Sequence, residues 1–346
     1  MAPLRFGLVG AGAIAGVLAE VVEAVDGARL TRVCDGGSGR ARGLARKFGA
    51  AFAPDLASLV SADDVDAVIV ATPSGHHADA VIAAAGHGKH ALVEKPLDVR
   101  LERCDAAIAA SRRNGTVLAG IFQNRFAPGV MAVREAVESG RLGRLVLVQG
   151  TVPWQRSAAY YEADAWRGTW WGDGGGALMN QGIHTVDLLL HLGGPLASVA
   201  AEVRTLRHAI DTEDTVAASL VFESGALGAL TVTTAAWPGI SARVELYGEH
   251  GSIVLEDGRI ARWLVADDAS DGATVAPAPD DGSGASDPLA IGSHLHRRQV
   301  EDFVEAVQQG RRPAVPAEEA RRAVEAVLAV YGSAREGTRV TLPLAS

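Results

Sequence analysis

The sequence contains only two cysteines and no long apolar run. Cys34 and Cys104 fall in an expected strand and an expected helix. We interpret them as buried thiols in a reducing compartment, with a disulfide or a redox role as the alternative. No apolar run approaches roughly 20 residues, the length that crosses a bilayer, so the sequence predicts no membrane partner. The N-terminus passes directly into an expected strand without a basic segment or a cleavage site, which favours a cytoplasmic protein over a secreted one.

Positive charge is also scarce. The chain has 32 Lys and Arg against 41 Asp and Glu, and its net charge at pH 7 is −9. This balance argues against a nucleic-acid partner or an anionic membrane surface. The length of 346 residues predicts two domains, and 48% hydrophobic with 21% charged residues is ordinary for a soluble globular enzyme.

The first 123 residues alternate short apolar runs with alanine-rich helical patterns, which is typical of a parallel sheet covered on both faces. The expected strands are 4–10, 29–35, 50–53, 66–72, 89–94 and 116–122. The expected helices are 13–25, 39–48, 55–62, 77–87 and 100–114. Repeated βα units of this kind predict an α/β domain with a doubly wound parallel sheet over 1–123.

A second domain is expected over 124–346, with packing of its last helices on the first domain as the alternative. Its expected strands are 143–152, 196–206, 214–223, 226–235, 241–248, 252–256 and 338–342. Hairpin-like connections between several of them predict a large, mostly antiparallel sheet. The expected helices are 128–139, 176–192, 294–309 and 317–335. Residues 266–292 are rich in Ala, Asp, Gly, Ser and Pro, which predicts a surface loop or flap.

The first strand runs into a GxGxxA turn that opens a helix. Gly10 permits the tight turn, Gly12 lets the backbone approach a pyrophosphate, and the small Ala15 packs the helix on the strand. The diphosphate would then lie on the helix N-terminus at Ala13 and Ile14. The pattern predicts a dinucleotide site, with a purely structural turn as the alternative.

Asp35 ends the next strand and predicts which dinucleotide binds. A carboxylate there accepts hydrogen bonds from the ribose hydroxyls and repels a 2′-phosphate, so NAD is favoured over NADP. Ser38 and Arg40 are the residues that would accommodate NADP instead.

Further cofactor contacts are expected where later strands end. Thr72, Pro73 and His77 follow the fourth strand, and we expect this loop to contact the ribose and the nicotinamide. Helix capping is the alternative, and the adjacent His76 and His77 have no third ligand that would make a metal site. Glu94, Lys95 and Gln123 follow the next two strands and complete the expected cofactor site. Lys95 is of special interest, because the proline after it fixes the backbone and its position at a strand end points it into the crevice.

The motifs together resemble the glucose-fructose oxidoreductase / inositol dehydrogenase / MocA family. The matching pieces are GLVGAGAIA, ATPSGHHADAVIAAAGHGKHALVEKPL at 71–97, FQNRF at 122–126, GGGALMNQGIHTVDLLLHLGG at 174–194 and the C-terminal segment. The resemblance covers essentially the whole chain. It implies a Rossmann domain plus an α/β domain with a large antiparallel sheet. It also implies homodimers or homotetramers and sugar, inositol or related alcohol substrates.

The resemblance also assigns residues. Lys95 matches the family's substrate-binding and catalytic lysine, and His184 matches the histidine that gives or takes the proton. Asn180 stands where many relatives have aspartate, so any mechanism that needs a carboxylate at this position is in doubt. A subset of the family carries MNQGIH as this chain does.

Asn180, His184, Asp187 and His191 share one face of the expected helix 176–192. Four ligands spread over three helical turns cannot converge on one ion, so a metal site is disfavoured. A structural role for His184 is the other alternative. We expect Asn180 to bind a substrate hydroxyl and Asp187 to orient its neighbours at the substrate site.

The segment 153–171 holds four of the six tryptophans together with Arg156, Tyr160 and Arg167. Aromatic faces with guanidinium and hydroxyl donors suit a carbohydrate pocket, and Arg167 and Tyr160 are the main candidates for substrate contact. For Trp166 and Trp170, packing within the loop is the alternative.

These features predict an NAD-dependent dehydrogenase of a sugar, inositol or sugar derivative. As hydride leaves the alcohol carbon, His184 would take the hydroxyl proton while Lys95 stabilises the same oxygen. A hydrolase or lyase that oxidises its sugar only transiently is the alternative. A regulatory protein without chemistry is disfavoured by the presence of both Lys95 and His184.

Overall fold

The structure is a computed structural model that describes residues 2–266 and 293–344. The chain divides into two compact units. Unit 1 contains Met1–Gln123 and Ser293–Arg321, and unit 2 contains Asn124–Gly292 and Arg322–Ser346. The loop expected over 266–292 lies outside the described residues from position 267 onward.

Unit 1 is a doubly wound α/β unit, as predicted. Its six strands are all parallel and have the order β3-β2-β1-β4-β5-β6. The strands are β1 (Leu4–Val9), β2 (Ala28–Cys34), β3 (Ala51–Phe52), β4 (Ala67–Val70), β5 (His90–Val93) and β6 (Leu118–Gly120). The helices are α1 (Ala13–Ala24), α2 (Arg40–Lys47), α3 (Leu56–Val60), α4 (His77–Gly86), α5 (Leu101–Arg113) and α9 (His294–Gln309), with a 3₁₀ turn η1 (Ser74–His76).

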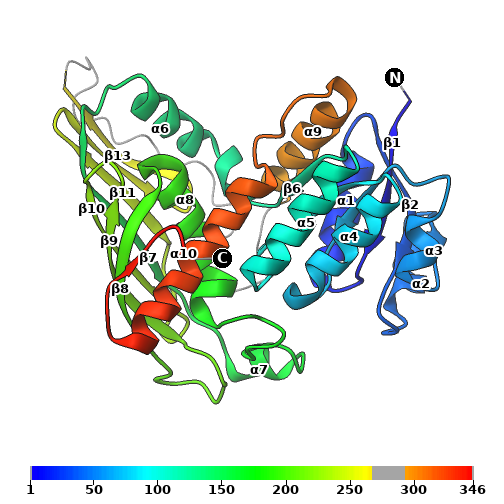
Figure 1. Ribbon diagram of the computed structural model, residues 1–346, viewed down its shortest axis with the longest axis horizontal. Coiled ribbons are helices and arrows are strands. Elements are labelled where there is room, and N and C mark those ends of the chain that lie inside the picture. Colours follow the sequence, from blue (N-terminus) through cyan, green and yellow to red (C-terminus); the bar gives the residue numbers. More distant parts are fainter. Residues whose placement is uncertain (1, 267–292, 345–346) are drawn as a thin grey trace. The chain divides into compact units, whose positions relative to one another are not determined.

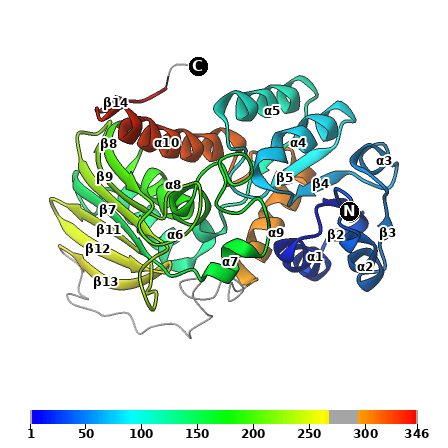
Figure 2. The same ribbon diagram turned by 90° about the horizontal axis from the view of Figure 1, so that it is seen from below.

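Helices cover both faces of the parallel sheet, which explains why its strands are almost continuously apolar. Figure 2 shows α1, α2 and α9 on one side and α4 and α5 on the other. Helix α9 belongs to this core although it comes from the last part of the chain. Its Phe303 packs against Phe6 of β1, with the ring centroids 6.1 Å apart.

Both cysteines are buried in unit 1 as free thiols. Burial raises the pKa of Cys34 to about 12 and also raises the pKa of Cys104, so neither is a reactive thiolate at neutral pH.

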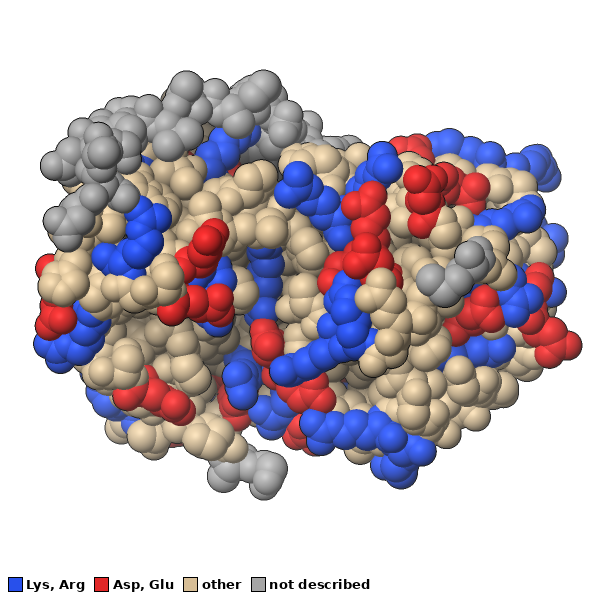
Figure 3. Space-filling model, turned by 90° about the horizontal axis from the view of Figure 1, so that it is seen from above, with Lys and Arg blue, Asp and Glu red and all other residues tan. Residues whose placement is uncertain are grey.

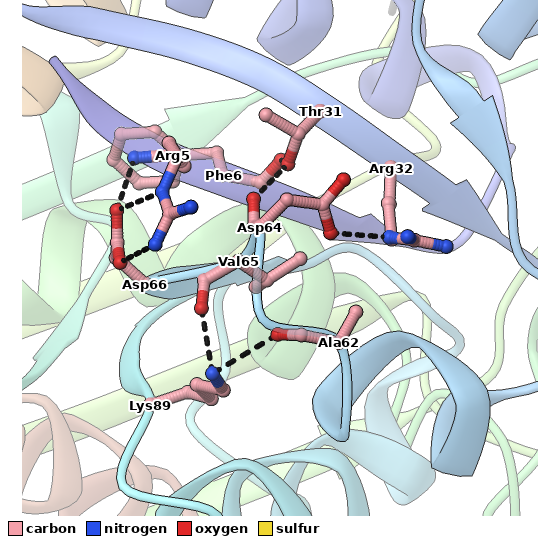
Figure 4. Close-up of polar contacts among 9 residues, drawn as sticks. All are labelled: Arg5, Phe6, Thr31, Arg32, Ala62, Asp64, Val65, Asp66 and Lys89. Carbon is pink, nitrogen blue, oxygen red and sulfur yellow. Dashed lines mark hydrogen bonds and ion pairs between the residues drawn. The ribbon is translucent and has the colours of Figure 1, made fainter.

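The amino ends of the strands are tied together by polar contacts (Figure 4). The guanidinium of Arg5 binds both carboxylate oxygens of Asp66, at 2.8 and 2.7 Å. The Lys89 ammonium donates to the carbonyl oxygens of Ala62 and Val65, at 3.1 and 2.7 Å. These contacts fix the segment before β4 at the edge of the sheet opposite to the ligand-binding edge, so they serve stability.

Unit 2 contains the second sheet, whose eight strands have the order β13-β12-β11-β7-β10-β9-β8-β14. The sheet is mostly antiparallel, as predicted, and β10 with β7 is a parallel pair. Its strands are β7 (Leu145–Pro153), β8 (Leu196–Arg204), β9 (Thr215–Phe222), β10 (Leu227–Thr233), β11 (Arg243–Gly248), β12 (Gly251–Glu256), β13 (Arg259–Val265) and β14 (Val340–Thr341).

The helices of unit 2 gather on one face of this sheet, where α8 packs on β7 and β11 and α6 packs on β12 and β13 (Figure 1). They are α6 (Pro128–Glu138), α7 (Ala158–Glu162), a π-helical turn η3 (Ala177–Gly182) and α8 (Ile183–Gly193). Helix α10 (Ala317–Glu336) begins in unit 1 and continues in unit 2, and the 3₁₀ turn η2 (Gln123–Phe126) spans the boundary between them.

The structure corrects the sequence-based elements in three places. Strand β13 and the short helix α7 were not expected. Strand β13 is an edge strand whose arginines and half-exposed side chains weaken its apolar pattern. The helix expected over 176–192 opens with the π-helical η3 instead of an α-helical turn.

Charges of both signs are mixed over the surface in view in Figure 3, in keeping with the modest net charge of −9. Among the described residues, no helix combines the length and the apolar character that a bilayer crossing demands.

Candidate functional site

The turn after β1 has the geometry that a dinucleotide phosphate needs. Gly10 has a φ of +113°, and a Cβ there would lie 2.3 Å from the Ala71 carbonyl oxygen, so only glycine fits. Gly12 is the N-cap of α1, has no side-chain cap, and has open space where a Cβ would be. The backbone N–H groups at Ala13 and Ile14 are therefore left to an anionic ligand, and the residues present fit a dinucleotide.

Asp35 lies at the end of β2 and is held by its own loop. Its carboxylate accepts hydrogen bonds from Gly37 N at 3.0 Å, Ser38 Oγ at 2.5 Å and Ala41 N at 3.0 Å. Burial raises the pKa of Asp35, but the hydrogen bonds outweigh it and the net pKa is lowered. The sequence could not show that Ser38, a candidate NADP residue, is bound to this carboxylate.

The loop after β4 is braced by His77. Its imidazole is buried, with Nδ1 2.7 Å from the Pro96 carbonyl oxygen and Nε2 2.9 Å from the Thr72 carbonyl oxygen. Burial lowers the pKa of His77. The ring thus connects the Thr72–Pro73 loop to the turn after β5. Thr72 and Pro73 themselves are half-buried.

Glu94 and Lys95 follow directly at the end of β5. Glu94 is buried, and its Oε2 accepts a hydrogen bond from Lys95 N at 3.2 Å. Burial raises the pKa of Glu94 to about 7. Lys95 is half-buried, and its peptide bond to Pro96 is cis. Gln123 is buried just beyond β6, so the predicted cofactor residues lie at the ends of three adjacent strands.

Asp98 was not predicted as a site residue. It is fully buried and accepts hydrogen bonds from Ala78 N at 3.1 Å and Arg100 N at 3.2 Å. It thereby fixes the turn that carries Lys95 to the start of α4. A polar residue directly after the Lys-Pro-Leu turn was the available signal for it.

In unit 2, the predicted substrate residues gather around the start of η3. Asn180 Nδ2 donates to Asp173 Oδ1 at 2.5 Å, and Asp173 Oδ2 accepts from Gly168 N at 2.8 Å. Asp173 is buried, at 2% exposure. A carboxylate can only accept, so this contact orients the Asn180 amide with its NH₂ group toward Asp173. The sequence analysis missed Asp173.

A second buried carboxylate explains the π-helical start. Glu213 accepts hydrogen bonds from Gly176 N and Leu178 N, each at 2.9 Å, and from Tyr331 Oη at 2.9 Å. Tyr331 Oη in turn accepts from Met179 N at 3.2 Å. The first amides of the segment are thus bound by tertiary partners. A Cβ at Gly176 would lie 1.8 Å from the Glu213 carbonyl oxygen, so this approach requires glycine.

Tyr160 lies at the centre of the aromatic segment. Its ring is stacked under the guanidinium groups of Arg167 and Arg156, whose Cζ atoms are 4.4 and 5.5 Å from the ring centroid. Gln181 Nε2, on η3, donates to Tyr160 Oη at 3.0 Å. Arg167 also pairs with Asp164 at 3.2 Å. The predicted substrate residues Tyr160, Arg167 and Asn180 therefore belong to one polar cluster of unit 2.

Trp170 packs within unit 2, with its ring edge-on to Tyr331 at a centroid distance of 5.3 Å. Its Nε1 donates to the Asp211 carbonyl oxygen at 3.0 Å, although the side chain is about half exposed. Trp166 is stacked with the Arg167 guanidinium at 4.8 Å.

Helix α8 carries His184, Asp187 and His191. His184 is half-buried, whereas Asp187 is 1% exposed and forms a two-point ion pair with Arg125 at 2.8 and 2.6 Å. This pair ties α8 to η2. Burial, reinforced by Arg125 and Arg134, lowers the pKa of His191 to about 3, so this imidazole is neutral. In the described part of the chain, no group of three or more His, Cys, Asp or Glu is arranged to hold a metal ion.

Comparisons with known proteins identify the family of this chain. Residues 4–122 match the family model "Oxidoreductase family, NAD-binding Rossmann fold", and residues 130–254 match "GFO/IDH/MocA C-terminal domain". The chain is 29% identical to inositol 2-dehydrogenase of Rhizobium meliloti (strain 1021) over 89% of each protein. It is 31% identical to inositol 2-dehydrogenase 2 of Saccharopolyspora erythraea over 73% of each.

Solved structures agree as well. The WlbA dehydrogenase from Bordetella pertussis, in complex with NADH and UDP-GlcNAcA, superimposes with a TM-score of 0.88 and 33% identity, covering 99% of this chain and 100% of that one. A levoglucosan dehydrogenase complex with NADH and L-sorbose gives a TM-score of 0.88 with 25% identity over both full chains. The chain therefore belongs to the GFO/IDH/MocA family, and is an NAD-dependent oxidoreductase that moves a hydride between the nicotinamide and a CH–OH group of a sugar, inositol or sugar derivative.

Proposed function

We propose that the substrate is a sugar derivative with an acidic group, of the nucleotide-linked uronate class. The observation that carries this proposal is the Arg156–Tyr160–Arg167 cluster. Arg156 is 4% exposed, and burial, with a contribution from Arg167, lowers its pKa. An anionic substrate group beside these guanidinium groups would offset that cost. The WlbA dehydrogenases from two organisms, which share 33% and 32% identity with this chain, were crystallised with UDP-GlcNAcA.

A cyclic polyol such as an inositol is the second candidate substrate. Several relatives that are 27–31% identical to this chain are named inositol 2-dehydrogenases. Asn180 and Tyr160 would suit neutral hydroxyl groups as well as those of a uronate.

The chain's residues have the following roles in the proposed reaction. When NAD is bound, it accepts the hydride that leaves the alcohol carbon. Lys95 donates a hydrogen bond to the alcohol oxygen and stabilises the negative charge that develops there. We assign His184 the role of the general base that takes the hydroxyl proton. Loss of hydride and proton leaves the ketone, and reduction reverses both transfers.

We assign the remaining predicted residues to substrate binding, to NAD binding or to holding a neighbouring residue in position. Asn180, whose amide is oriented by Asp173, would bind a neighbouring substrate hydroxyl, and Arg167 and Tyr160 would contact the acidic part of the substrate. We assign Asp187 a supporting role, because its carboxylate is buried against Arg125. Gly10, Gly12, Asp35 and Thr72 would contact NAD directly, while His77 would hold the Thr72–Pro73 loop in place.

We further propose a cytoplasmic homodimer or homotetramer that pairs through the open face of the second sheet. Leu227 of β10 is 58% exposed there, and Leu264 of β13 is also exposed. Apolar side chains on a sheet face without a helix over it favour association with a second copy.

The test is a substrate panel followed by NADH absorbance. UDP-GlcNAcA, UDP-GlcNAc, myo-inositol and levoglucosan are each mixed with the enzyme and NAD, and then with NADP. We expect NADH to form with UDP-GlcNAcA and not with UDP-GlcNAc. Reaction only with myo-inositol would favour the second candidate, and product without net NADH would indicate the hydrolase or lyase alternative.

A further inference from the structure

The nicotinamide half of the cofactor must lie at the carboxyl ends of β4, β5 and β6. The strand order reverses between β1 and β4, and a dinucleotide binds across such a switch point with one half on each side. The Gly10–Gly12 turn and Asp35 lie at the ends of β1 and β2, which places the adenosine half on that side. The other half then lies beside Lys95.

Three polar side-chain atoms at these strand ends are buried without a hydrogen-bond partner among the described residues. They are Thr72 Oγ1 after β4, Glu94 Oε1 after β5 and Gln123 Oε1 after β6. Burying such an atom without a hydrogen-bond partner is unfavourable. Because all three atoms lie at the carboxyl ends of β4, β5 and β6, they indicate that a polar ligand binds there.

Helix α9 brings two more polar side chains to the same place. Gln299 Nε2 donates to the carbonyl oxygen of Gly120, the last residue of β6, at 2.7 Å. His296 Nε2 lies 4.0 Å from Glu94 Oε1. His296 and Gln299 are each 2% exposed and are three residues apart, so they share one face of the helix.

These two residues stand out from the rest of the buried face of α9, which is apolar. Val300, Phe303 and Val304 join the core of unit 1. The chain that follows α9 also binds the edge of the sheet, since Gly120 N donates to the Val315 carbonyl oxygen at 3.1 Å. The returning segment is thus fixed against β6, and its two buried polar residues are held beside Glu94 and Gly120.

We propose that His296 and Gln299 are positioning residues for the nicotinamide half of NAD. His296 sets the position of the Glu94 carboxylate, and Gln299 fixes the end of β6 from which Gln123 extends. This inference rests on the proposed function, because it concerns the same NAD site. Helix α9, which follows residues 124–292 of unit 2 in the chain, thereby has a role at the cofactor site of unit 1.

Two ligands separate this role from a general effect on the fold. NADH contains the nicotinamide half, whereas ADP-ribose lacks the nicotinamide ring. The full-length protein and the variants His296→Phe and Gln299→Met are titrated with both ligands by fluorescence and calorimetry. We expect the Kd for NADH to rise about five- to tenfold in each variant, while the Kd for ADP-ribose stays within about twofold.

Gln309→Met is the matched control, because Gln309 is exposed at the end of the same helix. It should change neither Kd. Equal weakening of both ligands, or no change in the ratio of the two Kd values, would overturn the proposal. If a variant does not fold, His296→Gln and Gln299→Asn replace it, and the same ratio decides. If the unmodified protein binds neither ligand, the proposed function itself fails.

Discussion

The buried Asp173 carboxylate accepts a hydrogen bond of 2.5 Å from the half-buried Asn180 side-chain amide. An aspartate at position 180 would meet a second carboxylate, that of Asp173, whereas the Asn180 amide donates a hydrogen bond to it. A carboxylate is therefore present next to position 180, although the side chain at 180 is neutral.

The first prediction exchanges these two residues. Asn180→Asp should destabilise the protein by about 1–3 kcal/mol at neutral pH, because two carboxylates are forced together. Asp173→Asn should also destabilise it, since an amide cannot accept from both donors in the same way. The double variant Asp173→Asn/Asn180→Asp restores one carboxylate and one amide, and we expect it to recover most of the stability. Urea unfolding of the four proteins measures this, and a double variant as unstable as the sum of the singles would contradict it.

The second prediction concerns Lys95. Lys95→Met should lower turnover of the substrate found in the panel by orders of magnitude, because the developing oxyanion loses its cationic donor. The affinity for NAD should remain nearly the same. Lys47→Met is the control, since Lys47 is exposed in an ion pair with Glu20. Parallel losses of turnover and NAD affinity would remove Lys95 from the chemical step.

The third prediction follows from the raised pKa of Glu94. Burial raises this pKa from 4.5 to about 7, so the folded protein holds a proton that the unfolded chain releases. The wild type should therefore lose stability as the pH rises from about 4.5 to about 7, by on the order of 3 kcal/mol. Lys95 and His296 are the charged or titratable groups beside this carboxyl.

Glu94→Gln cannot ionise, so its stability relative to the wild type should increase across that pH range. Denaturant unfolding at several pH values measures the difference. Glu305→Gln, at an exposed position of α9, serves as the control. A constant difference between wild type and Glu94→Gln would show that Glu94 has an ordinary pKa.

The fourth prediction concerns Asp214, a fully buried carboxylate that accepts hydrogen bonds from the backbone N–H groups of Leu206, Arg207 and His208, at 2.9, 2.7 and 2.9 Å. Burial raises its pKa, but these bonds outweigh burial and lower it below 3.8. Its contribution to stability is thus complete above the unfolded pKa and is lost as the pH falls through the lower folded pKa. Asp214→Asn should cost about 2–3 kcal/mol near neutral pH and less in acid.

Thermal and denaturant unfolding at neutral and acidic pH tests this, with the exposed Asp211→Asn as control. A loss for Asp214→Asn that persists undiminished at the lowest pH would contradict the assignment.

The fifth prediction tests the open face of the second sheet. Leu227→Lys places a charge on the open face of the second sheet and should shift the protein toward monomers. Leu206→Lys is the control, because Leu206 is 69% exposed in a loop after β8. Light scattering after size-exclusion chromatography measures both. An unchanged mass for Leu227→Lys would place the subunit contact elsewhere.

The sequence was sufficient for the two sheets and for the glycine turn, because these depend on local periodicity and on backbone positions that admit only small residues. Gly10 is an example, because a Cβ there would lie 2.3 Å from the Ala71 carbonyl oxygen. It was not sufficient for η3, because Glu213 and Tyr331 compete for its amides from 35 and 152 residues away. The sequence around η3 gives no indication of hydrogen-bond partners that lie so far away in the chain.

The same limit applies to the candidate site. His77 was expected to face the cofactor, but its two nitrogens contact backbone carbonyl oxygens, one of them 19 residues away. Asp173 carries no helical or strand signal and becomes visible only through its contact with Asn180. The sequence shows that His77 and Asp173 are polar residues. Their hydrogen-bond partners lie elsewhere in the chain and become known only from the folded structure.

The order of segments in unit 1 has a consequence for biosynthesis. The apolar surface around Phe6 is covered by Phe303 of α9, which the ribosome makes only after residues 124–292 of unit 2. During synthesis, residues 1–123 must therefore keep this apolar surface exposed to solvent until the segment 124–292 has been translated. We expect this chain to rely on chaperones in the cell, and a premature stop after residue 292 to yield an aggregating product rather than an independent nucleotide-binding fragment.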